Sequence, residues 1–347
     1  MSMVSVEQLR VRLSQMEERR AYFERKSTQP PTRLTRHEVW RHSYLSYPYL
    51  IGAPDDRIAL RFRDIFINQT ELGHSGKIGM RPFQTDDSFL QSFTHMLEEY
   101  GSRGGSPPSN VIMDARKPLF RYFQNGDPIA IRMFSGYNVP PSPILVKYGR
   151  RQFLDPMLNA GEIRICPASF YNNSGFLESA RDDETSRYLF IPTFRERLAG
   201  KHHFDFQGHR ISFGHDDIML PVIVPDYYLF SLCDHVYYRM PTDFDADAAL
   251  IIRDPARFIR QVISAFLARS PEWHVFHGPV TYYDPYRDHT NHDFTKFKVP
   301  EMVKHFAYAY QREVRIALRA KRSIRSALEP IHISIGAMTE YAELLYA

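Results

Sequence analysis

The sequence contains few cysteines and no long apolar run. Only Cys166 and Cys233 occur among 347 residues, too few for a disulfide framework or a zinc site built from cysteines. Both lie in apolar, strand-like runs, where a free cysteine behaves as a small buried hydrophobe. No apolar run approaches the ~20 residues that a membrane span requires, and the opening MSMVSVEQLRVRL lacks the apolar core of a signal peptide. We therefore expect a cytoplasmic protein without a membrane partner.

The common nucleotide and hydrolase signatures are also missing. The sequence has no Walker A loop, no glycine-rich dinucleotide fingerprint and no G-x-S-x-G elbow. Gly73, Gly76 and Gly79 follow no predicted strand and open no predicted helix, so we do not expect them to cradle a phosphate. The histidine clusters show no i, i+4 helical pair with a third ligand, and we expect no metal site there.

The overall composition is that of a globular protein. Hydrophobic residues make up 43% and charged residues 24% of the chain, which argues against disorder. Aromatic residues reach 14% and favour a β-rich core with ring-lined clefts. The net charge of +4 permits a nucleic-acid or nucleotide partner without requiring one.

The first 139 residues predict a helical or mixed domain of unknown role. A narrow apolar stripe predicts a helix over residues 5–26. Residues 58–62 alternate polar and apolar side chains, and we predict a strand there. Residues 128–133 are predicted to form another strand.

The rest of the chain, residues 140–347, is dominated by strand patterns. Pro140, Pro141 and Pro143 form a stiff connector, so we place the boundary between two domains near residue 139. A closing helix is predicted over residues 338–346. The predicted fold class is α+β.

Residues 144–165 form the most informative stretch. They open with an apolar run typical of a buried strand and continue with the cationic turn Lys147-Tyr148-Gly149-Arg150-Arg151. A short amphipathic helix follows, and Gly161 is expected to end it because glycine tolerates the left-handed conformation. Residues 162–166 alternate like a half-buried strand. Such a strand, turn, helix and strand make a compact place to hold an anion or a cofactor.

Glu313 is a candidate catalytic carboxylate in the motif QREVRI. On a strand, Val314 and Ile316 face the core while Glu313 and Arg315 face the other way together. Arg312 and Arg315 would keep the carboxylate ionised near neutral pH. It could then bind a ribose hydroxyl or stabilise a developing cation; the alternative is a surface ion pair on a sheet face.

A second acidic group is the run Asp182-Asp183-Glu184. It could bind a divalent cation or supply a general base, as in a metal-dependent nuclease or hydrolase. The alternative is a solvated face, which is the usual place of a charge run.

Several of these motifs resemble those of the ADP-ribosyltransferase fold. Val146-Lys147-Tyr148-Gly149, a short helix and Leu158-Asn159-Ala160-Gly161-Glu162-Ile163 look like its opening, and QREVRI resembles its final motif, in which a Glu begins a strand. The layout also resembles an uncharacterised bacterial family with KYR, SxxFND and ExExR motifs, the middle one matching Ser169-Phe170-Tyr171-Asn172-Asn173. The resemblance covers residues 144–347. It implies a split β-sheet domain of that fold.

The resemblance implies an enzyme that uses NAD as a substrate. Glu313 would stabilise the oxocarbenium-like transition state, and Tyr148 would take the first-strand position at the nicotinamide riboside. Arg150 or Arg151 would meet the pyrophosphate, and Tyr171 would stack on the nicotinamide. The cofactor-binding residues implied are Lys147, Arg150, Arg151, Tyr171, Asn172 and Ser231. Tyr148 stands where the family usually has His or Arg, so neither of the family's usual triads is complete.

A basic run follows Glu313 and bears on the acceptor. It suits nucleic acid through phosphate contacts, and the alternative is a solvated strand edge. Its cations are Arg312, Arg315, Arg319, Lys321, Arg322 and Arg325.

Three functions remain open at this point. The first is an NAD-dependent ADP-ribosyltransferase, such as a bacterial toxin or antiphage effector that modifies nucleic acid or protein. The second is a non-catalytic binding module of the same fold, serving as an antitoxin, sensor or defence scaffold, or paired with a cognate antitoxin or defence partner. The third is the nuclease that uses Asp182, Asp183 and Glu184.

Overall fold

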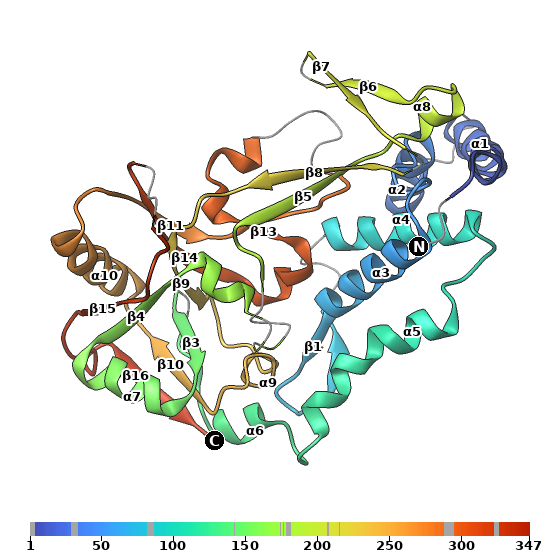
Figure 1. The fold of residues 1–347 in the computed structure, drawn as a ribbon. Helices are drawn as coiled ribbons and strands as arrows, with labels where there is room; N and C mark the ends of the chain where they lie inside the picture. Colours follow the sequence, from blue (N-terminus) through green and yellow to red (C-terminus); the bar gives the residue numbers. More distant parts are fainter. Residues whose placement is uncertain are drawn as a thin grey trace.

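The chain folds into an α+β structure with helices on one side and a large antiparallel sheet on the other (Figure 1). The computed structural model describes residues 4–28, 34–81, 87–141, 143–173, 175, 177, 182–206, 208–214, 216–287, 295–322 and 326–347.

The helical side is built from the first part of the chain. Its helices are α1 (Val6–Thr28), α2 (Arg36–Ser46), α3 (Asp55–Gln69), α4 (Asp87–Ser102) and α5 (Ser109–Arg116). The helix predicted over residues 5–26 is confirmed by α1, whereas the strand predicted over 58–62 is wrong because those residues belong to α3. Ile58, Phe62 and Ile65 are all buried, and their spacing of four and three residues is that of one helical face.

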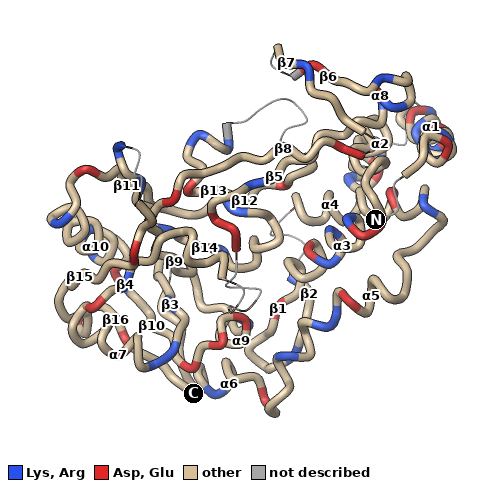
Figure 2. The backbone as a smooth tube through the Cα atoms, viewed as in Figure 1, with Lys and Arg blue, Asp and Glu red and all other residues tan. Residues whose placement is uncertain are grey.

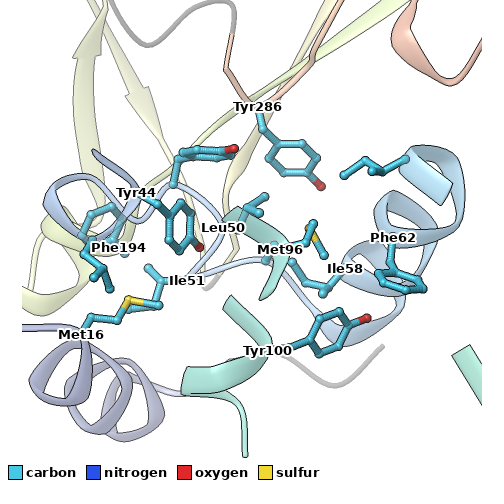
Figure 3. Close-up of a cluster of buried hydrophobic side chains, with 14 of the residues drawn as sticks. Met16, Tyr44, Leu50, Ile51, Ile58, Phe62, Met96, Tyr100, Phe194 and Tyr286 are labelled. Atoms are coloured by element: carbon cyan, nitrogen blue, oxygen red, sulfur yellow. The ribbon is translucent and has the colours of Figure 1, made fainter. Parts of the chain in front are cut away.

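The core of the helical side includes side chains from much later in the sequence. Met16, Ile58 and Met96 pack in one cluster with Phe194 and Tyr286 (Figure 3). The helices therefore pack against the second part of the chain, and a domain boundary at residue 139 remains a prediction.

Short elements lie between α3 and α4 and between α5 and the large sheet. They are the hairpin β1 (Thr70–Leu72) and β2 (Ile78–Met80), the 3-10 helix η1 (Lys117–Phe123) and the helix α6 (Ile129–Met133). The strand predicted over residues 128–133 is therefore wrong. Pro128 immediately precedes α6, and its restricted φ suits the start of a helix.

The large sheet has eight strands, and six of them follow the order β11-β14-β9-β3-β10-β16. The last two, β4 and β15, join it through the pairing of β4 with β9. The strands are β3 (Leu145–Gly149), β4 (Glu162–Pro167), β9 (Tyr228–Cys233), β10 (Ala248–Ile252), β11 (Trp273–Pro279), β14 (Glu313–Ala320), β15 (Ile331–Ser334) and β16 (Ala342–Tyr346).

Helices cover both faces of this sheet. Leu145 and Leu250 pack with Phe258 of α10 (Pro255–Arg269), while Val146 and Ile251 pack with Met133 of α6 on the other face. The short helix α9 (Met240–Asp243) completes that second cluster. Period-two alternation along β3 and β10 thus supplies two cores at once.

The helix α7 (Arg151–Ala160) joins β3 to β4, as the strand-helix-strand pattern predicts. Gly161 ends it in the left-handed conformation with φ of 67°, which confirms the predicted C-cap. A Cβ at this position would lie 2.1 Å from the carbonyl oxygen of Gly336, so only glycine allows this approach.

The predicted closing helix over residues 338–346 is wrong. Residues 342–346 form β16, which pairs with β10 from Ala342 opposite Ile252 to Tyr346 opposite Ala248. The chance to pair with an otherwise open edge of β10 outweighs the local helical spacing.

Three two-stranded sheets and several short helices complete the second part of the chain (Figure 1). The pairs are β5 (Ser186–Ile191) with β8 (Ile218–Ile223), β6 (His203–Phe206) with β7 (His209–Ser212), and β12 (Thr281–Tyr283) with β13 (Val303–His305). The short helices are η2 (Ala168–Asn172), α8 (Phe194–Leu198), η3 (Thr295–Lys298), η4 (Pro300–Met302) and η5 (Phe306–Gln311).

Charged residues are distributed over the whole fold. Figure 2 shows Lys and Arg interspersed with Asp and Glu on both the helical side and the sheet side. Within the ranges that the structure describes, no helix has both the length and the apolar character needed to cross a membrane.

Candidate functional site

The site begins where the large sheet splits. One edge of β9 pairs with β14 over its whole length, from Tyr228 opposite Leu318 to Cys233 opposite Glu313. The other edge is shared: β4 pairs near its start at Leu229, and β3 pairs at its end at Cys233. Ser231 therefore lies in the interval of β9 between the two pairings.

A cavity of about 140 Å³ occupies this split. We call it the ring-sized cavity, because an engineered cavity of roughly 150 Å³ in another protein holds a benzene molecule. Its walls come from β3, η2, β9, the end of α9, the loop before β5 and the segment from β13 to β14. They include Lys147, Tyr148, Tyr171, Asp182, Glu184, Ser231, Phe244, Lys304, Gln311 and Glu313.

Glu313 is the first residue of β14 and is held by three donors. Its Oε1 accepts from Ser231 Oγ at 2.5 Å and from Arg315 Nε at 2.6 Å, and its Oε2 accepts from Lys304 Nζ at 3.0 Å. Only 4% of the residue is exposed. Burial by itself raises the pKa of this carboxyl, but the charges of Arg315 and Lys304 outweigh burial and lower the pKa to about 2. The carboxylate is therefore ionised at neutral pH.

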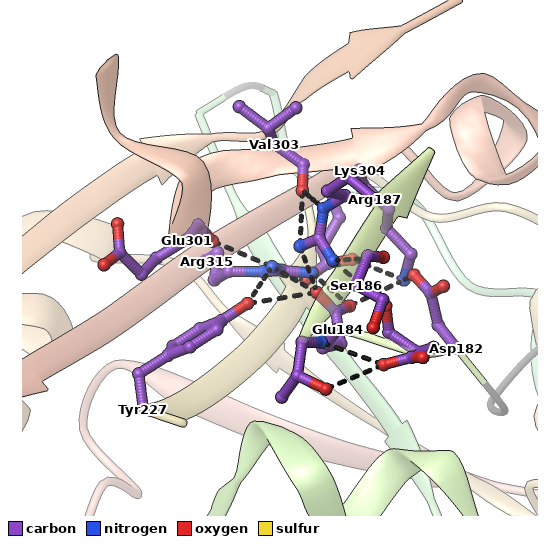
Figure 4. Close-up of polar contacts among 12 residues, drawn as sticks. Asp182, Glu184, Ser186, Arg187, Tyr227, Glu301, Val303, Lys304 and Arg315 are labelled. Atoms are coloured by element: carbon purple, nitrogen blue, oxygen red, sulfur yellow. Dashed lines mark hydrogen bonds and ion pairs between the residues drawn. The ribbon is translucent and has the colours of Figure 1, made fainter. Parts of the chain in front are cut away.

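Arg315 joins Glu313 to a second buried carboxylate, Glu184. Figure 4 shows the contact between Arg315 and Glu184. The Arg315 guanidinium binds both oxygens of Glu184, at 2.7 and 2.9 Å. Arg187 and Tyr227 also donate to Glu184, each at 3.1 Å. Burial raises the pKa of Glu184, and the cations around it, Arg315 first, reverse that effect and hold the pKa well below its usual value.

Lys304 lies among three carboxylates. Besides Glu313, its ammonium is 3.6 Å from Glu184 Oε1 and 3.7 Å from Asp182 Oδ2, and it donates to Gln311 Oε1 at 3.1 Å. Burial and the neighbouring Glu184 charge raise the pKa of Asp182 to about 7. One ammonium thus faces a carboxylate that stays ionised and another that takes up a proton near neutral pH.

The predicted first-strand residues line the same cavity. Lys147 Nζ donates to the backbone carbonyl of Ser231 at 2.8 Å and lies 4.5 Å from the centre of the Phe230 ring. Burial lowers the pKa of this lysine. Tyr148 is part of the cavity wall and also of the core cluster around Val146. Its hydroxyl accepts from the Tyr237 amide at 2.8 Å and donates to the Tyr237 carbonyl at 3.3 Å.

Five of the predicted residues thus meet at one cavity: Lys147, Tyr148, Tyr171, Ser231 and Glu313. Three others do not line it. Arg150 pairs with Asp245, Arg151 pairs with Asp155 at 3.1 Å, and Asn172 is exposed at the end of η2. A pyrophosphate role for Arg150 or Arg151 has no support from their positions.

The predicted basic run does not form one surface. Arg315 is fully buried, so the prediction that it contacts nucleic acid is wrong. Arg312 pairs with Asp234 at 3.2 Å, and Arg319 pairs with Glu301 at 3.0 Å. Arg322 is exposed, and Arg325 lies outside the described residues.

The acidic run is divided between different environments. Asp183 Oδ1 accepts from the amide and hydroxyl of Thr185 in a turn, while Glu184 is neutralised by guanidinium groups. Across the described part of the chain, no three or more His, Cys, Asp and Glu residues are grouped to hold a metal ion. The nuclease hypothesis therefore lacks a suitable donor set at Asp182, Asp183 and Glu184.

Sequence reasoning missed Lys304 and Gln311. Both contact Glu313 or its partners. Lys304 belongs to no motif, and no spacing relates it to Asp182. Gln311 is the last residue of η5 and the first residue of QREVRI, and its place in that motif, two residues before Glu313, was the available signal.

A wide cavity of about 590 Å³ lies on the other side of Glu313. Glu313 is the residue that lines both cavities. Arg81, Arg312 and Tyr282 contribute to the wall of the wide cavity. Tyr282 Oη accepts from the amide of Glu313 at 2.9 Å, which fixes the start of β14 between the two spaces.

Comparison with known proteins gives no relative to guide the assignment. No protein-family model, curated protein or solved structure matches the chain. A function must therefore be inferred from the site itself.

Proposed function

We propose that the protein is an NAD-dependent ADP-ribosyltransferase and that the ring-sized cavity takes the nicotinamide end of NAD. The observation that carries this proposal is the Glu313 carboxylate, buried and ionised, on the wall of a cavity that also has Tyr148 and Tyr171 in its lining. An aromatic-lined space of this size suits a flat heteroaromatic ring.

The chemistry requires a fixed negative charge beside the ribose. When the bond between nicotinamide and ribose C1′ breaks, positive charge develops on the ribose, and a preorganised carboxylate stabilises it. Ser231, Arg315 and Lys304 hold Glu313 in one position, so the carboxylate does not have to reorganise during the reaction.

The wide cavity offers space for the remainder of NAD, which is longer than the ring-sized cavity. Arg81 and Arg312 on its wall are suited to phosphate oxygens because guanidinium groups form paired hydrogen bonds with them. Glu71 and Asp234 pair with these two arginines and orient them. In this proposal they replace Arg150 and Arg151 as the pyrophosphate contacts.

The direct test is nicotinamide release from NAD, together with transfer of labelled ADP-ribose. We expect Glu313→Gln to lower the rate by about 10²–10³-fold, the usual loss for one electrostatic stabiliser. Glu162→Gln is the matched control, because Glu162 also begins a strand but is exposed. Ser231→Ala, which keeps the carboxylate, should give a smaller loss. Unchanged release in Glu313→Gln would rule out this site.

We propose further that this enzyme acts as a bacterial toxin or antiphage effector that modifies nucleic acid or protein. Both cysteines are free and buried, which fits the reducing cytoplasm. Expression of the wild type should then arrest growth of a bacterial host, and Glu313→Gln should relieve the arrest. Toxicity that persists in Glu313→Gln would count against the site.

The alternative is a binding module that holds NAD without cleaving it. It is favoured by the complete pairing of the Glu313 carboxylate, since both oxygens already accept from a cation. Under this alternative NAD binds saturably to the wild type, and no nicotinamide appears.

A further inference from the structure

Asp182 lies where two spaces meet. It lines the ring-sized cavity, and it also lines a separate groove of about 410 Å³. The walls of this groove include Tyr188, Tyr283 and Tyr308, so we call it the tyrosine-lined groove. Asp182 is the residue that the linings of these two spaces share, and its side chain is 16% exposed.

One side of the tyrosine-lined groove comes from the first part of the chain. Leu60 and Ile67 of α3 and Pro118 of η1 form one side of it. The tyrosines of the second part of the chain form the other. A molecule that enters between these two sides reaches Asp182 without passing through the wide cavity.

We propose that Asp182 is the proton acceptor of the transfer reaction, taking the proton from an O–H nucleophile that arrives through the tyrosine-lined groove. This inference rests on the proposed function. Asp182 and Glu313 face the same ammonium, that of Lys304, at 3.7 and 3.0 Å. Two carboxylates therefore border the space in which C1′ of the ribose would lie, as in enzymes that cleave glycosidic bonds.

The transfer breaks the bond to nicotinamide and forms a bond to the incoming oxygen. The bond from C1′ to the nicotinamide nitrogen breaks, and its electron pair leaves with nicotinamide, which becomes neutral. A bond forms between C1′ and the oxygen of water or an acceptor hydroxyl. The proton of that oxygen passes to an Asp182 carboxylate oxygen and then to solvent.

The surroundings of Asp182 suit a base that works near neutral pH. Burial and the Glu184 charge raise its pKa to about 7, while Lys304, Arg187 and Arg315 act in the opposite direction. Glu313, beyond Lys304, has its pKa held at about 2. Environments that separate the pKa values of two carboxyl groups in one site commonly assign them different roles.

The test is the pH dependence of NAD hydrolysis, with water as the nucleophile. We expect the wild-type kcat to rise with pH and level off above an inflection near pH 7, because Asp182 must be ionised to accept a proton. Asp182→Asn should lower kcat by about 10²–10⁴-fold and remove the inflection. The dissociation constant for NAD should change by no more than a few fold.

Asp226→Asn is the control, because Asp226 lines none of the three spaces and an asparagine Oδ1 can still accept from the amides of Ser169 and Tyr227; it should keep the wild-type rate and inflection. A wild-type profile that is flat between pH 5.5 and 8.5 overturns the inference without any variant, and so does an active Asp182→Asn enzyme with an unchanged profile. Both results leave the proposed function standing. A wild type that releases no nicotinamide overturns the proposed function, and this inference falls with it.

Discussion

Replacing Arg315 by methionine should destabilise the protein more than most single substitutions do. Arg315 is 0% exposed and contacts Glu184 at 2.7 and 2.9 Å, Glu313 at 2.6 Å and the carbonyl of Glu301 at 2.8 Å. Methionine is long enough to fill much of the space but supplies no charge. Two buried carboxylates then lose their main partner, and removal of one partner from a buried ion pair typically costs about 3–5 kcal/mol.

Arg210→Met is the control, because both members of its ion pair are exposed. The Arg210 side chain is 69% exposed and pairs at 3.5 Å with Asp205, which is 66% exposed, so its loss should cost about 1 kcal/mol or less. Urea unfolding at pH 7.5, followed by circular dichroism, gives the free energy of unfolding of both variants. A difference between them below about 1 kcal/mol would refute the view that Arg315 compensates buried charge.

Unfolding of the wild type and of Arg315→Met at low pH tests whether the lost stability comes from the unpaired buried carboxylates. Because Glu313 has a folded-state pKa below its unfolded value, its stabilising contribution is present above about pH 4.3 and is lost as the pH falls towards about 2. Without Arg315 the buried carboxyls protonate more readily, so the penalty of Arg315→Met should shrink below about pH 4. Adding Glu184→Gln to Arg315→Met should recover at least about 1 kcal/mol at neutral pH, since it removes one unpaired charge.

Three further predictions concern stability. The pKa of Asp182 is about 7 in the folded protein, against an ordinary value of 3.8, so this group costs stability as the pH rises through that interval. The free energy of unfolding of Asp182→Asn should therefore exceed that of the wild type by more at pH 8 than at pH 5. Tyr148→Phe leaves the amide and carbonyl of Tyr237 without their partner and should cost about 1–3 kcal/mol by urea unfolding. Gly161→Ala should lower the melting temperature further than Gly136→Ala, because both positions have φ near 67° but only at Gly161 does a Cβ meet backbone; equal shifts would show that the close approach is relieved at little cost.

The face of β14 that carries the site was predictable from the sequence. Strict alternation places Glu313 and Arg315 on one face, and Ile316 and Leu318 pack in the core cluster on the other. The strand-helix-strand unit around Gly161 was predictable for a similar reason, since its signals are local. What alternation could not show is that the face with Glu313 is itself buried.

Two secondary-structure predictions were wrong for different reasons. The pattern at residues 58–62 was too short, and residues 342–346 pair with a strand that is distant in the sequence. Five alternating residues at 58–62 do not distinguish a strand from one face of α3, and the acidic pair Asp55-Asp56 at its start was the better signal of a helix. Residues 338–346 have helical spacing, yet β16 forms there through its pairing with β10.

The ion network was beyond prediction because it is assembled by the fold. Arg315 reaches Glu184 across 131 residues of sequence, and Lys304 reaches Asp182, in the loop before β5, from β13. No spacing rule connects such residues. The split of β9 between β3 and β4, which creates the cavity, likewise depends on pairings between distant segments.

The most direct test of the account is a crystal structure with a non-hydrolysable NAD analogue. We predict the nicotinamide ring in the ring-sized cavity beside Tyr148 and Tyr171, the adjoining ribose at Glu313, and the diphosphate in the wide cavity near Arg81 and Arg312. A folded protein that does not bind the analogue, or binds its nicotinamide ring away from Glu313, would contradict the account.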